Sequence, residues 1–195
     1  MLTLVLAATL VVEIPLYANV ELPPEALSRA LAEADRLFDS TGVRFAWRVS
    51  PAATETATSA LAAIVLTARP ERPVISGCTR NLHDHRLGRA ELGARRVTLW
   101  TEQVARAVAG SWDRRDTPRV DRNALGTALG RVLAHELGHL FLRLDGHRES
   151  GLMKPSFSQR ALVRSSDHSF RLSEKDLERV REAITHLQVS LAREP

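Results

Sequence analysis

The run His135-Glu136-Leu137-Gly138-His139 constrains this chain more than any other feature, because its spacing suits a helix and its side chains suit a metal ion. Residues four apart lie on the same face of an α-helix, so His135 and His139 can both direct an imidazole at one ion. Glu136 lies about 100° around the helix from His135, near the ion but poorly placed as a third ligand. It can therefore accept a proton from a zinc-bound water, whose pKa the metal lowers to about 7. The motif indicates a zinc site with its own general base.

The residues on both sides of this run predict one long helix over about 121–144. Apolar side chains recur at three- and four-residue spacing, namely at Leu125, Leu129, Val132, Leu133, Leu137, Leu140, Phe141 and Leu144. This stripe predicts a largely buried helix whose histidines face a cleft, where a metal would compensate the cost of burying them. We expect Asp121 or Asn123 to cap its start, and Gly146 to end it in a left-handed turn.

A third zinc ligand is expected just after this helix, because a catalytic zinc usually has three protein ligands and one open position for water. Asp145 lies six residues after His139, and His147 lies eight residues after it. His147 follows Gly146, where a reversed chain can return to the metal, and its imidazole matches the other two ligands. We assign the third ligand to His147, with Asp145 as the alternative.

These residues resemble the metzincin clan of zinc metallopeptidases. The pattern of that clan is HExxHxxGxxH, with an aspartate replacing the last histidine in some members, followed by a tight turn that carries a methionine below the metal. His135, Glu136 and His139 match the pattern, and Met153 within Gly151-Leu152-Met153 matches the turn. The resemblance implies a zinc metalloendopeptidase in which Met153 packs beneath the site.

The chain departs from the metzincin pattern in the link to the third ligand. Leu142 occupies the family's glycine position, and Asp145 occupies its strict third-ligand position. His147 requires two additional residues in the link. The strict spacing therefore favours Asp145, whereas ligand chemistry and the preceding glycine favour His147.

The remaining periodicities predict an α/β (α+β) fold. Pro23-Pro24-Glu25 begins a helix that ends at Gly42. We expect strands at 43–49, 61–68 and 96–100, a loop or edge region at 74–93, and helices at 101–109, 159–163 and 174–191. With a first strand near Glu13, this order is also the one that the metzincin resemblance implies: a twisted mixed β-sheet, a long active-site helix, a Met-turn and a C-terminal helix.

The N-terminal segment 1–12 is apolar, and it reads either as a short export signal or as the start of the first strand. It is too short to span a bilayer, so no stable membrane span is expected. Residues 13–195 are expected to form a single zinc metallopeptidase-like catalytic domain. By family resemblance we expect a secreted or periplasmic protein, with a cytoplasmic location left open.

Composition limits the partners of the chain. The net charge is +4 over 195 residues, and Lys154 and Lys175 are the only lysines, so the basic residues are almost all arginine. The arginines are scattered rather than gathered into one run, which does not favour a nucleic-acid-binding protein. We expect a monomer that acts on a peptide or protein substrate.

Four other residues have the chemistry of site residues but are interpreted otherwise. His83 and His85 flank an aspartate and are read as an exposed loop, because three successive residues cannot all face one ion without a sharp bend. Cys78, the single cysteine, is read as a buried core residue. His168 is read as a surface histidine rather than an oxyanion-stabilising group.

Two functions other than peptide hydrolysis fit the same zinc site. One is a non-catalytic, zinc-stabilised binding module, and the other is a zinc hydrolase acting on a non-peptide amide. Glu136 argues against the module, because a structural zinc site gains nothing from a general base and prefers a fourth protein ligand.

Overall fold

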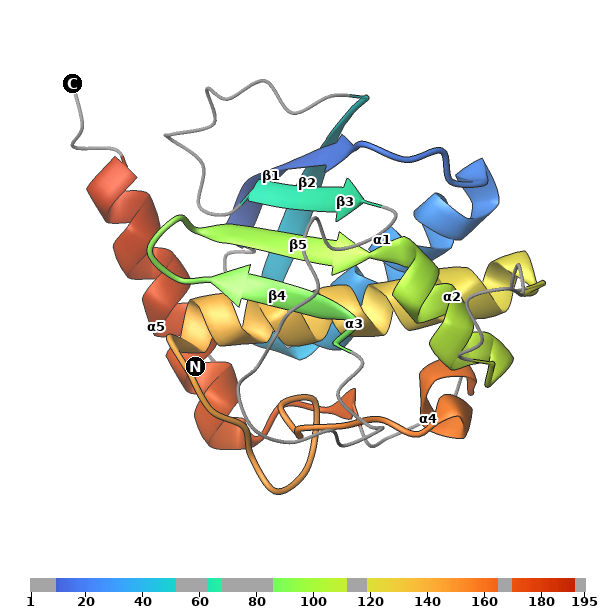
Figure 1. Cartoon of the computed structure of the whole chain (residues 1–195). Helices are drawn as coiled ribbons and strands as arrows, with labels where there is room; N and C mark the ends of the chain where they lie inside the picture. Colours follow the sequence, from blue (N-terminus) through green and yellow to red (C-terminus); the bar gives the residue numbers. More distant parts are fainter. Residues whose placement is uncertain (1–9, 52–62, 68–85, 112–118, 165–169, 192–195) are drawn as a thin grey trace, which may run out of the picture.

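A five-stranded mixed sheet forms one layer of the protein in a computed structural model, which describes residues 10–51, 63–67, 86–111, 119–164 and 170–191 (Figure 1). The strand order is β2-β1-β3-β5-β4. Four strands are parallel, and the edge strand β4 runs antiparallel to β5. The strands are β1 (Leu10–Ala18), β2 (Val43–Ser50), β3 (Ala63–Thr67), β4 (Gly88–Glu91) and β5 (Arg96–Trp100).

The helices confirm the expected order of elements. They are α1 (Pro24–Phe38), α2 (Thr101–Ala109), α3 (Arg122–Leu142), α4 (Gln159–Val163) and α5 (Glu174–Leu191). A short 3-10 helix, η1 (Asp39–Thr41), follows α1 and ends at Gly42, whose φ is 71°. In Figure 1, α3 runs along the sheet beside α1, with α5 at one end and α2 and α4 towards the other.

The first strand begins three residues before the expected start of the domain. Val12, Ile14 and Leu16 of β1 point into the core, whereas Val11 and Glu13 are exposed, which is the alternation of a sheet covered on one face. Residues 10–12 therefore belong to β1, and residues 1–9 lie outside the described part of the chain.

Helix α3 is buried on every side over most of its length, beyond the one-sided stripe that its sequence suggests. All residues from 126 to 141 are buried. Gly126 and Gly130 let α1 approach closely, because a Cβ at Gly126 would lie 2.6 Å from the Ala26 carbonyl and one at Gly130 would overlap the Ala30 carbonyl. The absence of two side chains thus allows α3 to pack directly against α1.

The ends of α3 fit the expectation at one terminus only. Asp121 caps the start by accepting a hydrogen bond of 2.9 Å from the Ala124 backbone N–H. The expected left-handed turn at Gly146 is wrong: the helix ends at Leu142, and Arg143 takes the left-handed conformation with φ 49°. The Arg143 N–H then bonds back to helix carbonyls, which satisfies the last turn without a glycine.

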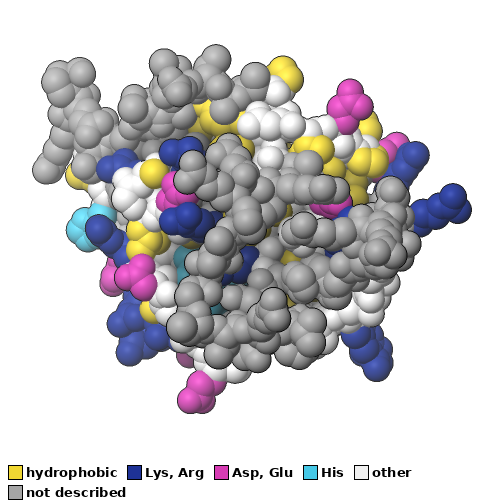
Figure 2. Space-filling view, viewed as in Figure 1, with side chains coloured by type: hydrophobic (Ala, Val, Ile, Leu, Met, Phe, Trp, Pro, Cys, Tyr) yellow, Lys and Arg dark blue, Asp and Glu magenta, His cyan; other side chains and the backbone are white. Residues whose placement is uncertain are grey.

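The described surface carries charges of both signs. On the face shown in Figure 2, basic side chains lie around the rim with acidic side chains among them. Within the described ranges, no helix is long and apolar enough to cross a membrane.

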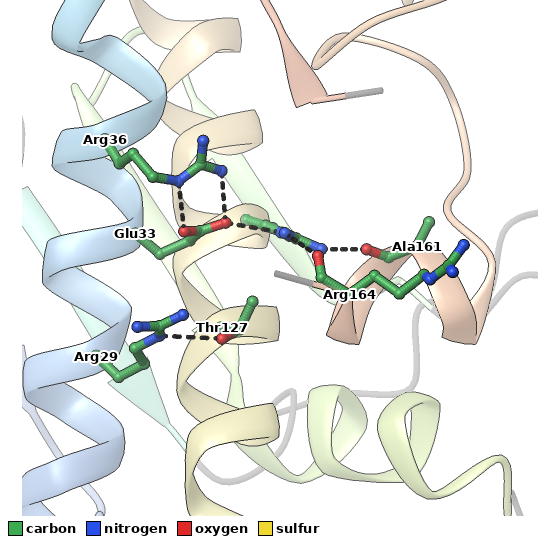
Figure 3. Close-up of polar contacts among 7 residues, drawn as sticks. Arg29, Glu33, Arg36, Thr127, Ala161 and Arg164 are labelled. Atoms are coloured by element: carbon green, nitrogen blue, oxygen red, sulfur yellow. Dashed lines mark hydrogen bonds and ion pairs between the residues drawn. The ribbon is translucent and has the colours of Figure 1, made fainter. Parts of the chain in front are cut away.

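A buried ion pair joins α1, α3 and α4 (Figure 3). Arg131 of α3 is fully buried and donates from Nε to Glu33 of α1 at 2.8 Å. Its other nitrogens donate to the backbone carbonyls of Ala161 and Arg164, and its guanidinium lies 4.6 Å from the centre of the Phe170 ring. Glu33 of α1 and the region 161–170 are therefore tied to the helix that carries the histidines.

Candidate metal centre

His135 and His139 lie on one face of α3, and each ring is oriented by a backbone carbonyl beyond the helix. The Nδ1 atom of His135 is 2.7 Å from the Leu152 carbonyl, and that of His139 is 2.6 Å from the Leu144 carbonyl. A carbonyl only accepts, so both Nδ1 atoms must donate. In the neutral rings the protons are therefore on Nδ1, and both Nε2 atoms carry lone pairs.

The two Nε2 atoms face one another at 3.1 Å. Two facing lone pairs repel, and a cation between them removes that repulsion. Tetrahedral zinc with nitrogens at about 2.0–2.1 Å separates two ligand atoms by about 3.3 Å, close to the observed spacing. Burial lowers the pKa of His135 to about 4, assisted by His139 and His147 and opposed by the hydrogen bond to Leu152, so this ring is neutral at pH 7. The arrangement fits a zinc ion.

His147 completes a cluster of three histidines. One ligand atom from each of His135, His139 and His147 lies within 4.8 Å of the others. The ring centres of His147 and His139 are 4.9 Å apart, and those of His147 and His135 are 5.3 Å apart. Unlike the two helix histidines, His147 is exposed. Partial desolvation of its ring by the surrounding protein, together with the charge of His139, lowers its pKa. Asp145 is also exposed and does not belong to this cluster.

The loop 143–153 brings His147 back to the helix. The chain reverses at Arg143, where the Leu144 N–H bonds to the His139 carbonyl at 3.0 Å. Further along, the Arg148 N–H donates to the Met153 carbonyl at 2.8 Å and closes the loop on itself. Chain reversal, which the sequence places at Gly146, therefore occurs three residues earlier.

Glu136 points towards the edge strand β4 and is buried. Burial raises the pKa of its carboxyl to about 7, although a hydrogen bond from the Ala90 backbone and the charge of Arg86 act in the opposite direction. A Cβ at Gly88 would lie 3.0 Å from the Cγ atom of Glu136, so the glycine provides the space for this side chain. A carboxyl with a pKa near neutrality is suited to accept and return a proton.

Met153 lies in the core directly against α3. It is 1% exposed, and a Cβ built on Gly138 would overlap its sulfur. The preceding turn is held in place because Gly151 has φ 77° and the Leu152 N–H donates to the Arg171 carbonyl at 2.9 Å. This turn places the Leu152 carbonyl against His135.

Several residues around the cluster carry no sequence signal that identifies them. The ring centre of Phe157 is 5.4 Å from that of His135, and Phe157 stacks on Phe170 at 4.6 Å. Arg148 forms an ion pair with Asp176 of α5 at 3.1 Å.

The earlier candidates Cys78, His83, His85 and His168 lie outside the described residues.

Comparison with known proteins identifies the fold. No protein-family model matches the chain, and no curated protein matches it in sequence. Archaemetzincin from Methanopyrus kandleri has a similar structure, with a TM-score of 0.56 and 15% identity over 93% of this chain and 99% of that one. Myroilysin gives a TM-score of 0.41 at 10% identity over 89% of this chain and 92% of that one, and this weaker likeness adds nothing to the assignment. The chain therefore shares the fold of archaemetzincin.

Proposed function

We propose that the protein is a zinc-dependent metallopeptidase that hydrolyses peptide bonds. His135, His139 and His147 would hold the ion, and Glu136 would be the general base. Zinc, when bound, supplies a Lewis acid that acidifies water and polarises a substrate carbonyl. The fold shared with archaemetzincin and the metzincin-like motif agree with this proposal.

The chain's own residues orient the ligands and transfer the protons. The carbonyls of Leu144 and Leu152 hold the two helix imidazoles with Nε2 unprotonated. Glu136 takes a proton from the attacking water and later passes it to the leaving amine. Its carboxyl is suited to both steps because its pKa, raised to about 7, is close to neutral pH.

One observation carries the proposal: the ligand atoms of three imidazoles converge within 4.8 Å of one another, and the residue that follows His135 is a buried carboxyl that is not among them. A structural zinc site would use a fourth protein ligand, and the described residues bring three to this cluster. A zinc ion held by these three imidazoles would keep one position open for water, and with Glu136 as base this would be the arrangement of a hydrolytic site.

The test is Glu136→Gln, measured for zinc content and for cleavage of a mixed peptide library. We expect about one zinc per chain to be retained and nearly all hydrolysis to be lost, because an amide cannot accept the proton of water. Glu178→Gln on α5, which removes an exposed carboxylate, is the matched control and should cleave like the unaltered protein.

Other results would redirect the assignment. Activity of Glu136→Gln within about tenfold of the unaltered protein would remove Glu136 from the role of base, since general-base catalysis typically contributes about 10²–10⁴-fold. Zinc binding by the unaltered protein without cleavage of any peptide would favour the binding module or a hydrolase of non-peptide amides.

A further inference from the structure

The loop 143–153 serves all three histidines at once. It contains His147 itself, and it supplies the Leu144 and Leu152 carbonyls that orient His139 and His135. The hydrogen bond that closes the loop runs from the Arg148 N–H to the Met153 carbonyl, and Arg148 is the residue next to His147. The position of Arg148 therefore bears directly on where the His147 imidazole lies.

Arg148 is anchored to the C-terminal helix. Its Nη2 atom donates to the Oδ1 atom of Asp176 at 3.1 Å, and the side chain of Asp176 is only 4% exposed. An ion pair with one buried partner is screened less by solvent than a fully exposed pair. This contact crosses 28 residues of sequence and connects the loop to α5.

Asp176 is itself held in a fixed orientation. Its Oδ2 atom accepts from the Ser173 hydroxyl at 2.8 Å, and its backbone N–H donates to the same hydroxyl oxygen at 3.1 Å. Ser173 thus caps the start of α5 while fixing the carboxylate. One carboxylate oxygen is occupied by the cap and the other faces Arg148, so the carboxylate is preorganised to receive the arginine.

We infer that Arg148 and Asp176 are positioning residues that hold His147 in place as the third metal ligand. The inference rests on the proposed zinc site. His147 is exposed and stands on a link two residues longer than the strict metzincin spacing, so α3 alone does not fix it. The pair ties the neighbouring residue to α5 and so reduces the conformational freedom that the imidazole would lose on binding an ion.

The test measures zinc affinity of the full chain by competition with a fluorescent zinc indicator. We expect Arg148→Ala to weaken zinc binding by about 10-fold or more, the range typical of groups that orient a ligand. Arg148→Lys, which keeps the charge but not the planar fork, should recover part of that loss. Asp176→Asn should resemble Arg148→Ala, and thermal unfolding of each metal-free protein verifies that it is folded.

Two further variants separate positioning from general stability. Arg181→Ala is the matched control, because Arg181 ties α5 to the Ser40 and Thr41 carbonyls away from the loop, and zinc affinity should not change. In a His147→Ala background, Arg148→Ala should produce no further loss, because no third ligand remains to be positioned.

The outcomes distinguish this inference from the proposed function. An equal loss from Arg148→Ala with and without His147 would overturn the positioning role, as would undiminished affinity in Arg148→Ala when the unaltered protein binds zinc. If the unaltered protein binds no zinc, the proposed function fails and the inference fails with it.

Discussion

The sulfur of Met153 lies so close to Gly138 that a Cβ at this position would overlap it. Gly138 lies between the two helix histidines, and Met153 follows the carbonyl that orients His135. The contact therefore sets the depth at which the turn 151–153 lies against α3. Because Met153 is almost fully buried, its side chain has little room to move aside.

Gly138→Ala should destabilise the protein by about 1–3 kcal/mol through overpacking, even though alanine favours a helix by about 0.5–1 kcal/mol over glycine. The sign should reverse when Met153 is also alanine, because the collision is then absent. Denaturant unfolding of the metal-free proteins measures both steps. Equal destabilisation in the two backgrounds would show that the methionine is not the obstacle.

His147→Ala should weaken zinc binding far more than Asp145→Ala, because only His147 belongs to the histidine cluster. The loss should match or exceed the about 10–100-fold that follows removal of a group supporting a ligand. Gly146→Ala is a useful control: Gly146 is not among the residues with positive φ, and a Cβ there meets nothing within 4 Å. A larger loss from Asp145→Ala would reassign the third ligand.

Glu136 should make the metal-free protein less stable as pH rises. Its folded pKa of about 7 lies above the ordinary value of 4.5, so its stabilising contribution is present below pH 4.5 and is lost as pH rises through 7. The difference between these two pKa values corresponds to about 3 kcal/mol in the free energy of unfolding. Relative to the unaltered protein, Glu136→Gln should therefore gain stability between these pH values. A constant difference across that range would contradict the assigned pKa.

Glu33→Gln should cost about 3–5 kcal/mol at pH 7, because it leaves the buried Arg131 without its anionic partner. Arg36→Ala removes the half-exposed partner of the same carboxylate and should cost less than about 1 kcal/mol. Burial would raise the pKa of Glu33, but hydrogen bonds and charges of Arg36 and Arg131 outweigh it and lower the pKa. The effect of Glu33→Gln should therefore shrink as pH falls through that lowered pKa, which unfolding at several pH values would measure.

The sequence predicts the elements that have a strong period or clear ends. Helix α2, strand β5, α4 and α5 have the expected bounds, because apolar periodicity, capping residues and adjacent turns agree there. Strand β4 lies within the region 74–93, which the sequence assigns to a loop or edge, and it is the edge strand of the sheet; its bounds are not predicted because Gly88–Glu91 contains no apolar alternation. Arg143 is missed for another reason: a left-handed conformation at a residue other than glycine is uncommon and has no side-chain signature.

The candidate site likewise has a part that the sequence predicts and a part that it does not. The spacing of His135, Glu136 and His139 places them on one helix without any tertiary information. The groups that orient them are the backbone carbonyls of Leu144 and Leu152 and the backbone N–H of Ala90; every residue type offers the former and every type but proline the latter. Only the fold brings those atoms to the helix.

Because the three histidines are unequally buried, zinc release would not require unfolding of the protein. The rate of zinc release would therefore differ from the rate of unfolding. His135 and His139 are 7% and 9% exposed on a helix packed on all sides, whereas His147 is exposed on a loop bounded by positive-φ residues at Arg143 and Gly151. Displacement of the largely exposed residues 145–149 would free His147 while the Leu144 and Leu152 carbonyls stay against His139 and His135, and local openings of this kind take microseconds to seconds. Zinc would then be exchanged through a motion at the surface, while His135 and His139 keep the orientation in which they would bind the next ion.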